Sequence, residues 1–153
     1  MLAGLIVSAD LPLAERLLRA AVHESGDAVA ALHFGLPLKE ALIRENGSGS
    51  TRYHHGLGPE LAESRAIVIF SGASAERDAF PLVDSCHDSR DLHNIDEMIA
   101  RFGLTWGEFE MGRLRFEAQF LVARLRPRIH RAAAALVQHR HLSAEQIARY
   151  ATV

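Results

Sequence analysis

The segment between Pro12 and Gly35 places the strongest constraint on how this chain can fold. Its apolar residues recur at helical spacing on two faces, which predicts one helix from Pro12 to Phe34. Proline suits the first turn of a helix, and Gly35 provides a stop. Because apolar residues cover most of its circumference, we expect this helix to be buried on more than one side, with other elements packed around it.

The rest of the chain predicts further helices and a small sheet. We expect capping boxes to start the last two helices, at Thr105 and Ser143, and Pro127 to kink or divide the first of these two. Phe109, Phe116 and Phe120 have the spacing of core residues. The chain, residues 1–153, is therefore predicted to be one mainly α (α+β) domain with a small β-hairpin or sheet. Its other expected elements are strands at 38–43 and 51–55, and helices at 59–75 and 89–102.

Charge and composition exclude several classes of protein. The net charge of −2 provides no overall basic field for nucleic acid or an anionic membrane. The single cysteine, Cys86, excludes an internal disulfide and fits a reducing compartment. No segment approaches the roughly 20 apolar residues of a membrane span, and the apolar stretch 1–7 is too short for a signal peptide. We expect a cytoplasmic protein without a membrane segment, or a fragment of a longer one.

One string inside the first helix carries chemistry: His23-Glu24-Ser25-Gly26-Asp27. In H-E-x-x-H, two histidines one turn apart bind zinc, and the glutamate acts as general base. Asp27 stands where the second histidine is expected. A simpler alternative is that His23 and Asp27 form an intrahelical hydrogen-bonded pair. Glu24 favours a site, because a carboxylate buried in an apolar helix needs a partner.

Four later segments follow this string in a recognisable order. They are Gly35-Leu36-Pro37, the Gly-x-x-Ala-Glu run 72–76, Asp91-Leu92 with 98–105, and the closing stretches 132–137 and 142–147. Together with the zinc-helix string, they make the chain from about residue 11 to 150 resemble the FtsH-type zinc peptidases. That family is the proteolytic part of membrane-anchored AAA+ proteases.

The resemblance implies a helical zincin-like peptidase fold acting on a peptide or protein. It makes Glu24 the catalytic base and assigns zinc to His23, Asp27 and Asp91, with Asp88 as the competing choice for the third ligand. The chain carries no phosphate-binding loop, so a partner ATPase would be a separate protein. Family members assemble as hexamers with their ATPase, and without that module we expect a smaller homo-oligomer.

Asp27 alters what the site can do. A carboxylate makes the ligand set one charge more negative, which weakens it as a Lewis acid and favours harder ions such as manganese or magnesium over zinc. Its oxygens also lie closer to the backbone than the outer nitrogen of histidine, so we expect a shorter reach toward a metal held by His23. His87 or His93 could supply a substitute ligand.

Three functions follow from these residues. The first is a degenerate metallopeptidase-like domain, or pseudoenzyme, with a vestigial or altered metal site that binds a peptide or partner. The second is an active metal-dependent endopeptidase using Glu24. The third is a helical interaction or nucleic-acid-associated module using the arginine-rich stretch 113–131, although its interspersed glutamates favour a solvated helix face.

Overall fold

The computed structural model describes residues 11–82 and 88–152, and for residues 88 and 89 only the backbone. The expectation of a mainly helical chain with a small sheet is confirmed. The described elements, in chain order, are α1 (Leu13–His33), β1 (Leu38–Ile43), β2 (Gly49–Tyr53), the short 3₁₀ helix η2 (Pro59–Leu61), α2 (Ala62–Ala79), α3 (Asp88–Phe102), α4 (Glu108–His139), β3 (His141–Ser143) and α5 (Ala144–Thr152).

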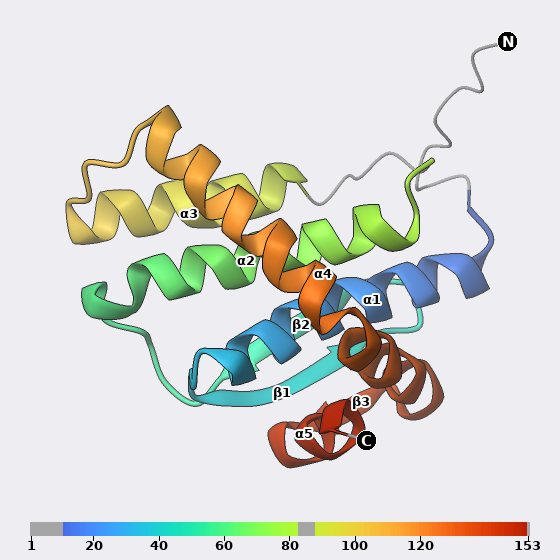
Figure 1. Ribbon diagram of the computed structural model, residues 1–153. Helices are drawn as coiled ribbons and strands as arrows, with labels where there is room; N and C mark the ends of the chain where they lie inside the picture. Colours follow the sequence, from blue (N-terminus) through green and yellow to red (C-terminus); the bar gives the residue numbers. More distant parts are fainter. Residues whose placement is uncertain (1–10, 83–87, 153) are drawn as a thin grey trace, which may run out of the picture.

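Helix α1 lies at the centre of the molecule (Figure 1). It packs against α2 and α4, and it also contacts β1, β2 and α5. The run from Ala28 to Ala31 is buried throughout, as a helix with neighbours on several sides requires. The helix ends as predicted, because Gly35 takes a positive φ of 66° that favours glycine. Burial of α1 on more than one side is therefore confirmed.

Gly26 is one of the positions where α1 and α2 approach each other closely. A Cβ atom at this position would lie 2.8 Å from Ala75 Cβ and 2.9 Å from the carbonyl oxygen of Ser71. Only a residue without a side chain allows the two backbones to come this close. The mid-helix glycine therefore has a packing role, which offsets its unfavourable helix propensity.

The three strands form one antiparallel sheet in the order β2-β1-β3. Ala41 in β1 pairs with Thr51 in β2 and with Leu142 in β3, and a register shift interrupts the β1–β2 pairing between Leu38 and Glu40. The second strand ends at Tyr53, two residues earlier than predicted. Within the described chain, β2 is an edge strand whose outer side pairs with no other strand.

The predicted capping box at Thr105 is wrong. Helix α4 begins at Glu108, and the Gly107 N–H donates a 2.8 Å hydrogen bond to the Glu110 carboxylate, which is half of a capping box. The helix is not divided at Pro127 and continues to His139. The capping box at Ser143 is confirmed. The Ser143 N–H donates to the Gln146 side chain at 2.8 Å, and the Gln146 N–H donates back to the Ser143 hydroxyl at 3.2 Å.

The prediction that three phenylalanines of α4 belong to the core is also wrong. Phe109, Phe116 and Phe120 are 80%, 68% and 60% exposed. The residues that α4 buries lie on the opposite side of the helix and include Leu114, Ala118, Leu121 and Leu125. The helix is therefore apolar on two faces, and spacing alone did not identify which one faces inward.

Several sequence predictions lie outside the described residues. They concern the stretch 1–7, Cys86, His87 and the side chain of Asp88. None of the helices in the described ranges combines the length and the apolar character that crossing a bilayer requires.

Replacing Gly26 by alanine should destabilise the protein, because the new methyl group would clash with α2. We expect a loss of about 1–3 kcal/mol in the free energy of unfolding, measured by urea denaturation. The matched control is Gly112→Ala in α4, where a Cβ would meet no atom within 4 Å. Gly112→Ala should raise the free energy of unfolding by about 0.5–1 kcal/mol, because alanine has a higher helix propensity than glycine. Equal effects at the two positions would contradict the packing role of Gly26.

Candidate metal centre

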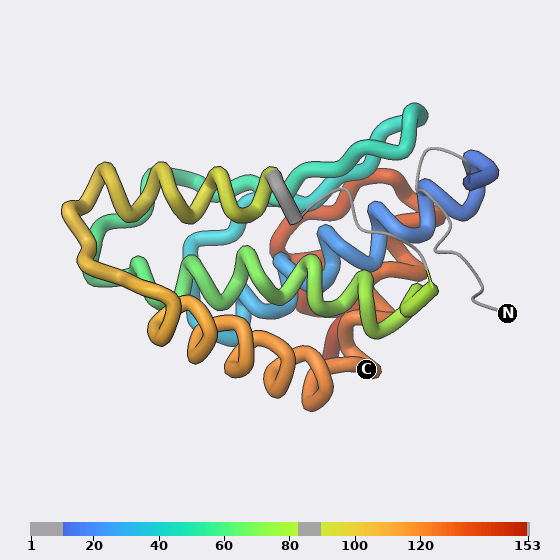
Figure 2. Tube along the Cα trace, turned by 90° about the horizontal axis from the view of Figure 1, so that it is seen from above, coloured from blue at the N-terminus to red at the C-terminus, as the bar shows by residue number. Residues whose placement is uncertain are grey.

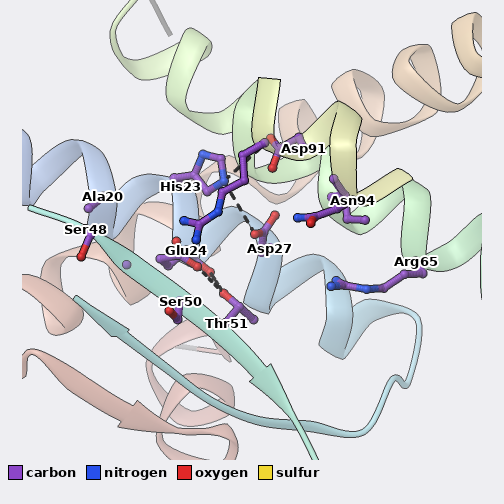
Figure 3. A pocket seen from close by; sticks show the side chains of 13 residues that line it. Ala20, His23, Glu24, Asp27, Ser48, Ser50, Thr51, Arg65, Asp91 and Asn94 are labelled. Carbon is purple, nitrogen blue, oxygen red and sulfur yellow. Dashed lines mark hydrogen bonds and ion pairs between the residues drawn. The ribbon is translucent and has the colours of Figure 1, made fainter. Parts of the chain in front are cut away.

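The structure brings together the three side chains that the family resemblance assigns to a metal. His23 and Asp27 lie one turn apart on α1, and Asp91 reaches the same point from α3 (Figure 3). Asp27 Oδ2 is 3.8 Å from His23 Nε2, and Asp91 Oδ2 is 4.0 Å from the same nitrogen. The shorter side chain of Asp27 therefore still reaches the outer nitrogen of the histidine.

These distances bear on whether a cation fits. Two donors bound to one tetrahedral zinc lie about 3.4 Å apart, so the observed separations are wider by roughly half an ångström. In the described chain no group of three or more His, Cys, Asp or Glu donors is arranged closely enough to hold a metal as it stands. The His23–Asp27 separation is too long for a direct hydrogen bond but within the range of an ion pair, so an intrahelical pair of these two residues is also consistent with the structure. The donor types fit a divalent cation, and small side-chain movements would close the site.

Two glycines make room for this cluster. A Cβ at Gly72 of α2 would lie 2.8 Å from His23 Nε2 and equally close to Asp27 Cγ. A Cβ at Gly49 of β2 would lie 2.6 Å from Glu24 Cγ. The face of α1 that carries His23, Glu24 and Asp27 therefore packs against glycine backbone of α2 on one side and of β2 on the other.

A buried ion pair supports His23 from the side away from the carboxylates of Asp27 and Asp91. Arg19 Nη2 lies 3.2 Å from Glu76 Oε1, and the other Glu76 oxygen lies 3.8 Å from His23 Nδ1. The side chains of Arg19 and Glu76 are almost fully buried. A carboxylate next to Nδ1 favours the tautomer that leaves Nε2 facing Asp27 and Asp91, as in carboxylate–histidine–metal arrangements. The sequence interpretation of Glu76 as a structural partner is consistent with this contact.

Acidic side chains outnumber basic ones in the cluster around His23. Burial alone would lower the pKa of His23, but the carboxylates of Glu76, Asp27, Glu24 and Asp91 outweigh it and raise that pKa to about 10. Burial also raises the pKa of Asp27 well above its usual value, despite the neighbouring imidazole. One oxygen of Asp27, Oδ1, is buried and accepts no hydrogen bond from the described residues. These groups require a proton or another cation between them.

Glu24 is held beside the cluster by the edge strand. The Thr51 hydroxyl donates a 2.6 Å hydrogen bond to Glu24 Oε2 (Figure 3). Burial raises the pKa of Glu24, while His23 and the Thr51 hydrogen bond oppose the shift. A carboxylate with a raised pKa is better suited to accept and release a proton near neutral pH than an exposed one.

A cavity of about 270 Å³ opens next to these residues. Its walls come from four elements, which are α1, β2, α2 and α3. Ser48, the residue before β2, also lines it. Besides His23, Glu24, Asp27 and Asp91, the walls include Ser48, Gly49, Ser50, Thr51, Arg65, Arg90 and Asn94. The unpaired edge of β2 therefore borders the same cavity as the charged cluster.

Sequence reasoning missed several of the polar residues around the cavity. Asn94 follows Asp91 by three residues on α3, and this helical spacing could have indicated a shared face. No comparable signal exists for Arg65, because its place depends on how α2 packs across α1. Arg65 donates a 2.8 Å hydrogen bond to the Tyr53 hydroxyl, and burial raises the pKa of that tyrosine.

Within the described ranges, His54, His55 and His93 and the arginine-rich stretch lie away from the cluster. His54 and His55 are exposed, as expected, and His93 pairs with Glu97 on the outer face of α3 rather than with the cluster. In α4, Arg113 binds Glu63 and Glu117, and Arg126 forms a bidentate pair with Asp78. Several of the α4 arginines therefore make structural contacts within the chain.

Comparison with known proteins does not identify the chain. No family model matches the sequence, and no curated protein matches it significantly.

The raised pKa of His23 predicts how the stability of the metal-free protein depends on pH. The native state keeps a proton that the unfolded chain loses above pH 6.5, so this stabilisation is complete below pH 6.5 and is lost as the pH rises toward about 10. In EDTA, the free energy of unfolding should fall by about 1 kcal/mol or more between pH 7 and pH 9. His23→Gln should change this slope by removing the imidazole proton, with Asp27 and Glu24 accounting for what remains, whereas the exposed control His93→Gln should keep the native slope. An unchanged slope in His23→Gln would contradict the assignment.

Proposed function

We propose that this chain is a degenerate metallopeptidase-like domain of the FtsH type. In this proposal His23, Asp27 and Asp91 bind a divalent cation, and extended peptides bind in the adjacent cleft. Hydrolysis is slow or absent because of Asp27. The observation that carries the proposal is the convergence of Asp27 Oδ2 and Asp91 Oδ2 on His23 Nε2.

The position of Asp91 is the strongest support. It lies far from His23 in the sequence and on a helix that packs mainly against α2, yet its carboxylate comes within 4.0 Å of the imidazole. Arg19 already pairs with Glu76, and the remaining buried carboxylates around His23 support a site for a further cation, because each buried charge costs several kcal/mol. Such a cluster is a common feature of functional sites.

The edge of β2 supports peptide binding. An extended peptide could add to this edge by main-chain hydrogen bonds, as in other β-strand additions. It would then run past Thr51 and Glu24, along a wall made of Ser48, Gly49 and Ser50. The small side chains of this wall leave space for the peptide backbone next to the charged cluster.

The chain supplies the parts of a hydrolytic reaction around that path. A divalent cation held at this point would provide Lewis acidity toward a carbonyl oxygen and toward water. In this proposal Glu24 would accept a proton from the attacking water and return it to the leaving amine. The Thr51 hydroxyl holds Glu24 in place for this proton transfer.

Asp27 is the reason to expect weak catalysis. It replaces a neutral imidazole by a carboxylate, so a bound cation would retain less charge to polarise a carbonyl or to acidify water. Oxygen donors also shift the preference from zinc toward manganese or magnesium. If a peptide is delivered by a separate ATPase, the cleft could bind it without rapid cleavage.

The proposal predicts metal binding together with a gain of function on restoring the histidine. Calorimetric titration should show one divalent cation per chain, with binding at least tenfold weaker in His23→Ala and in Asp91→Ala. Asp27→His should bind zinc more tightly than the native chain and cleave casein at least 100-fold faster. Glu24→Gln in the Asp27→His background should bind zinc and remain inactive.

Two results would overturn the proposal in different ways. If neither the native chain nor Asp27→His binds a divalent cation, the metal site and the peptidase ancestry are both wrong. If the native chain cleaves casein as fast as Asp27→His, the domain is an active endopeptidase and is not degenerate.

A further inference from the structure

The first half of α4 presents an exposed aromatic face that is separate from the candidate metal centre. Phe109, Phe116 and Phe120 recur at intervals of seven and four residues, so they lie along one side of the helix. Figure 2 shows this half of α4 on the opposite side of α2 from β2 and α3, which border the cavity. Three largely exposed phenyl rings on one helix face indicate an interaction surface.

This face contains both a projecting ring and a hollow. Phe109 is the most exposed of the three and lies in the first turn of α4. About three turns further on, a hollow of about 220 Å³ opens beside the other two rings. It is lined by Phe34, Ile67, Phe116, Glu117, Phe120, Leu121 and Arg124. An apolar cavity of about 150 Å³ can hold benzene, so this hollow is large enough for a phenyl ring.

The charges along α4 are distributed unevenly. Glu108 and Glu110 lie at its start, while Arg124 and Arg128 lie beyond the aromatic face. Two antiparallel copies of α4 would place the acidic start of one helix over the basic part of the other. A parallel arrangement would place like charges together. Antiparallel packing is therefore the electrostatically complementary one.

The same arrangement brings the Phe109 ring level with one end of the hollow. Phe116 lies midway between residues 109 and 123, so a two-fold axis near Phe116 places Phe109 of one copy opposite Ala123 of the other. Ala123 is small and exposed and borders a separate pocket with Arg77 and Asp78, while the next residue, Arg124, lines the hollow at nearly the same level of the helix. From this level the Phe109 ring of each copy would reach past Arg124 into its partner's hollow, which gives the reciprocal contact that a two-fold interface requires.

We propose that two copies of this chain form an antiparallel dimer through the first half of α4, with Phe109 of each copy in the hollow beside Phe116 and Phe120 of the other. The dimer leaves both candidate metal centres open, because the cavity residues come from α1, β2, α2 and α3 and from Ser48. This inference is independent of any metal or peptidase function.

The area of the face predicts a weak dimer. A phenylalanine side chain buries about 150–250 Å² at most, so the three rings provide several hundred Å² per copy. A standard interface buries about 800 Å² per partner. We therefore expect a dissociation constant in the micromolar range, with mostly dimer at about 100 μM chain and mostly monomer at about 1 μM.

Sedimentation equilibrium tests the dimer. Phe116→Glu should raise the dissociation constant at least tenfold without changing the circular dichroism spectrum. Leu82→Glu is the matched control, because Leu82 is 65% exposed but lies outside α4. It should dimerise as the native chain does. A native chain with the mass of one copy at about 300 μM, or equal weakening by both substitutions, would overturn the proposal.

Cross-linking tests the orientation. Cys86 is the only native cysteine, so cysteines can be placed individually in a Cys86→Ser background. Mixing Phe109→Cys with Ala123→Cys chains under mild oxidation should give a disulfide-linked heterodimer, and neither chain alone should cross-link to itself. Cross-linking of Phe109→Cys to itself would indicate a parallel pair and overturn the antiparallel arrangement.

Discussion

The close contact between α1 and α2 fixes how His23, Asp27 and Glu76 lie relative to one another in the candidate site. Gly26 and Gly72 remove the side chains that would keep the two helices apart. The contact brings Glu76 of α2 to one nitrogen of His23 and leaves the other nitrogen facing Asp27. With α1 fixed in this way, β2 meets Glu24 and α3 supplies Asp91. The site is thus a consequence of how tightly two helices pack.

The sequence predicted the parts of this arrangement that depend on local patterns. The long apolar helix, its stop at Gly35 and the capping box at Ser143 follow from helical periodicity and short-range hydrogen bonding. The positions of His23, Glu24 and Asp27 on one helix follow from the same periodicity. The convergence of Asp91 on His23 was expected from the family resemblance, and spacing within either segment gave no sign of it.

The sequence did not predict what depends on the relative orientation of elements. Helix α4 carries leucines and alanines on one face and phenylalanines on the other, and both faces have helical spacing. The inner face is the one with small and branched residues because α4 packs closely on α1 and α2. Arg65 and Thr51 line the cavity because of how α2 and β2 pack against α1, and this packing cannot be read from the local sequence around either residue. The start of α4 was misplaced because the Glu110 side chain caps Gly107, while Thr105 lies outside the helix.

The central claim is that His23, Asp27 and Asp91 share one cation. The most direct measurement is anomalous diffraction from crystals soaked separately in zinc and in manganese, recorded on both sides of each absorption edge. The account predicts a single anomalous peak about 2.0–2.2 Å from His23 Nε2 and from one oxygen of each carboxylate. Peaks confined to surface histidines such as His54 and His93, with the cluster at His23 unchanged, would contradict it.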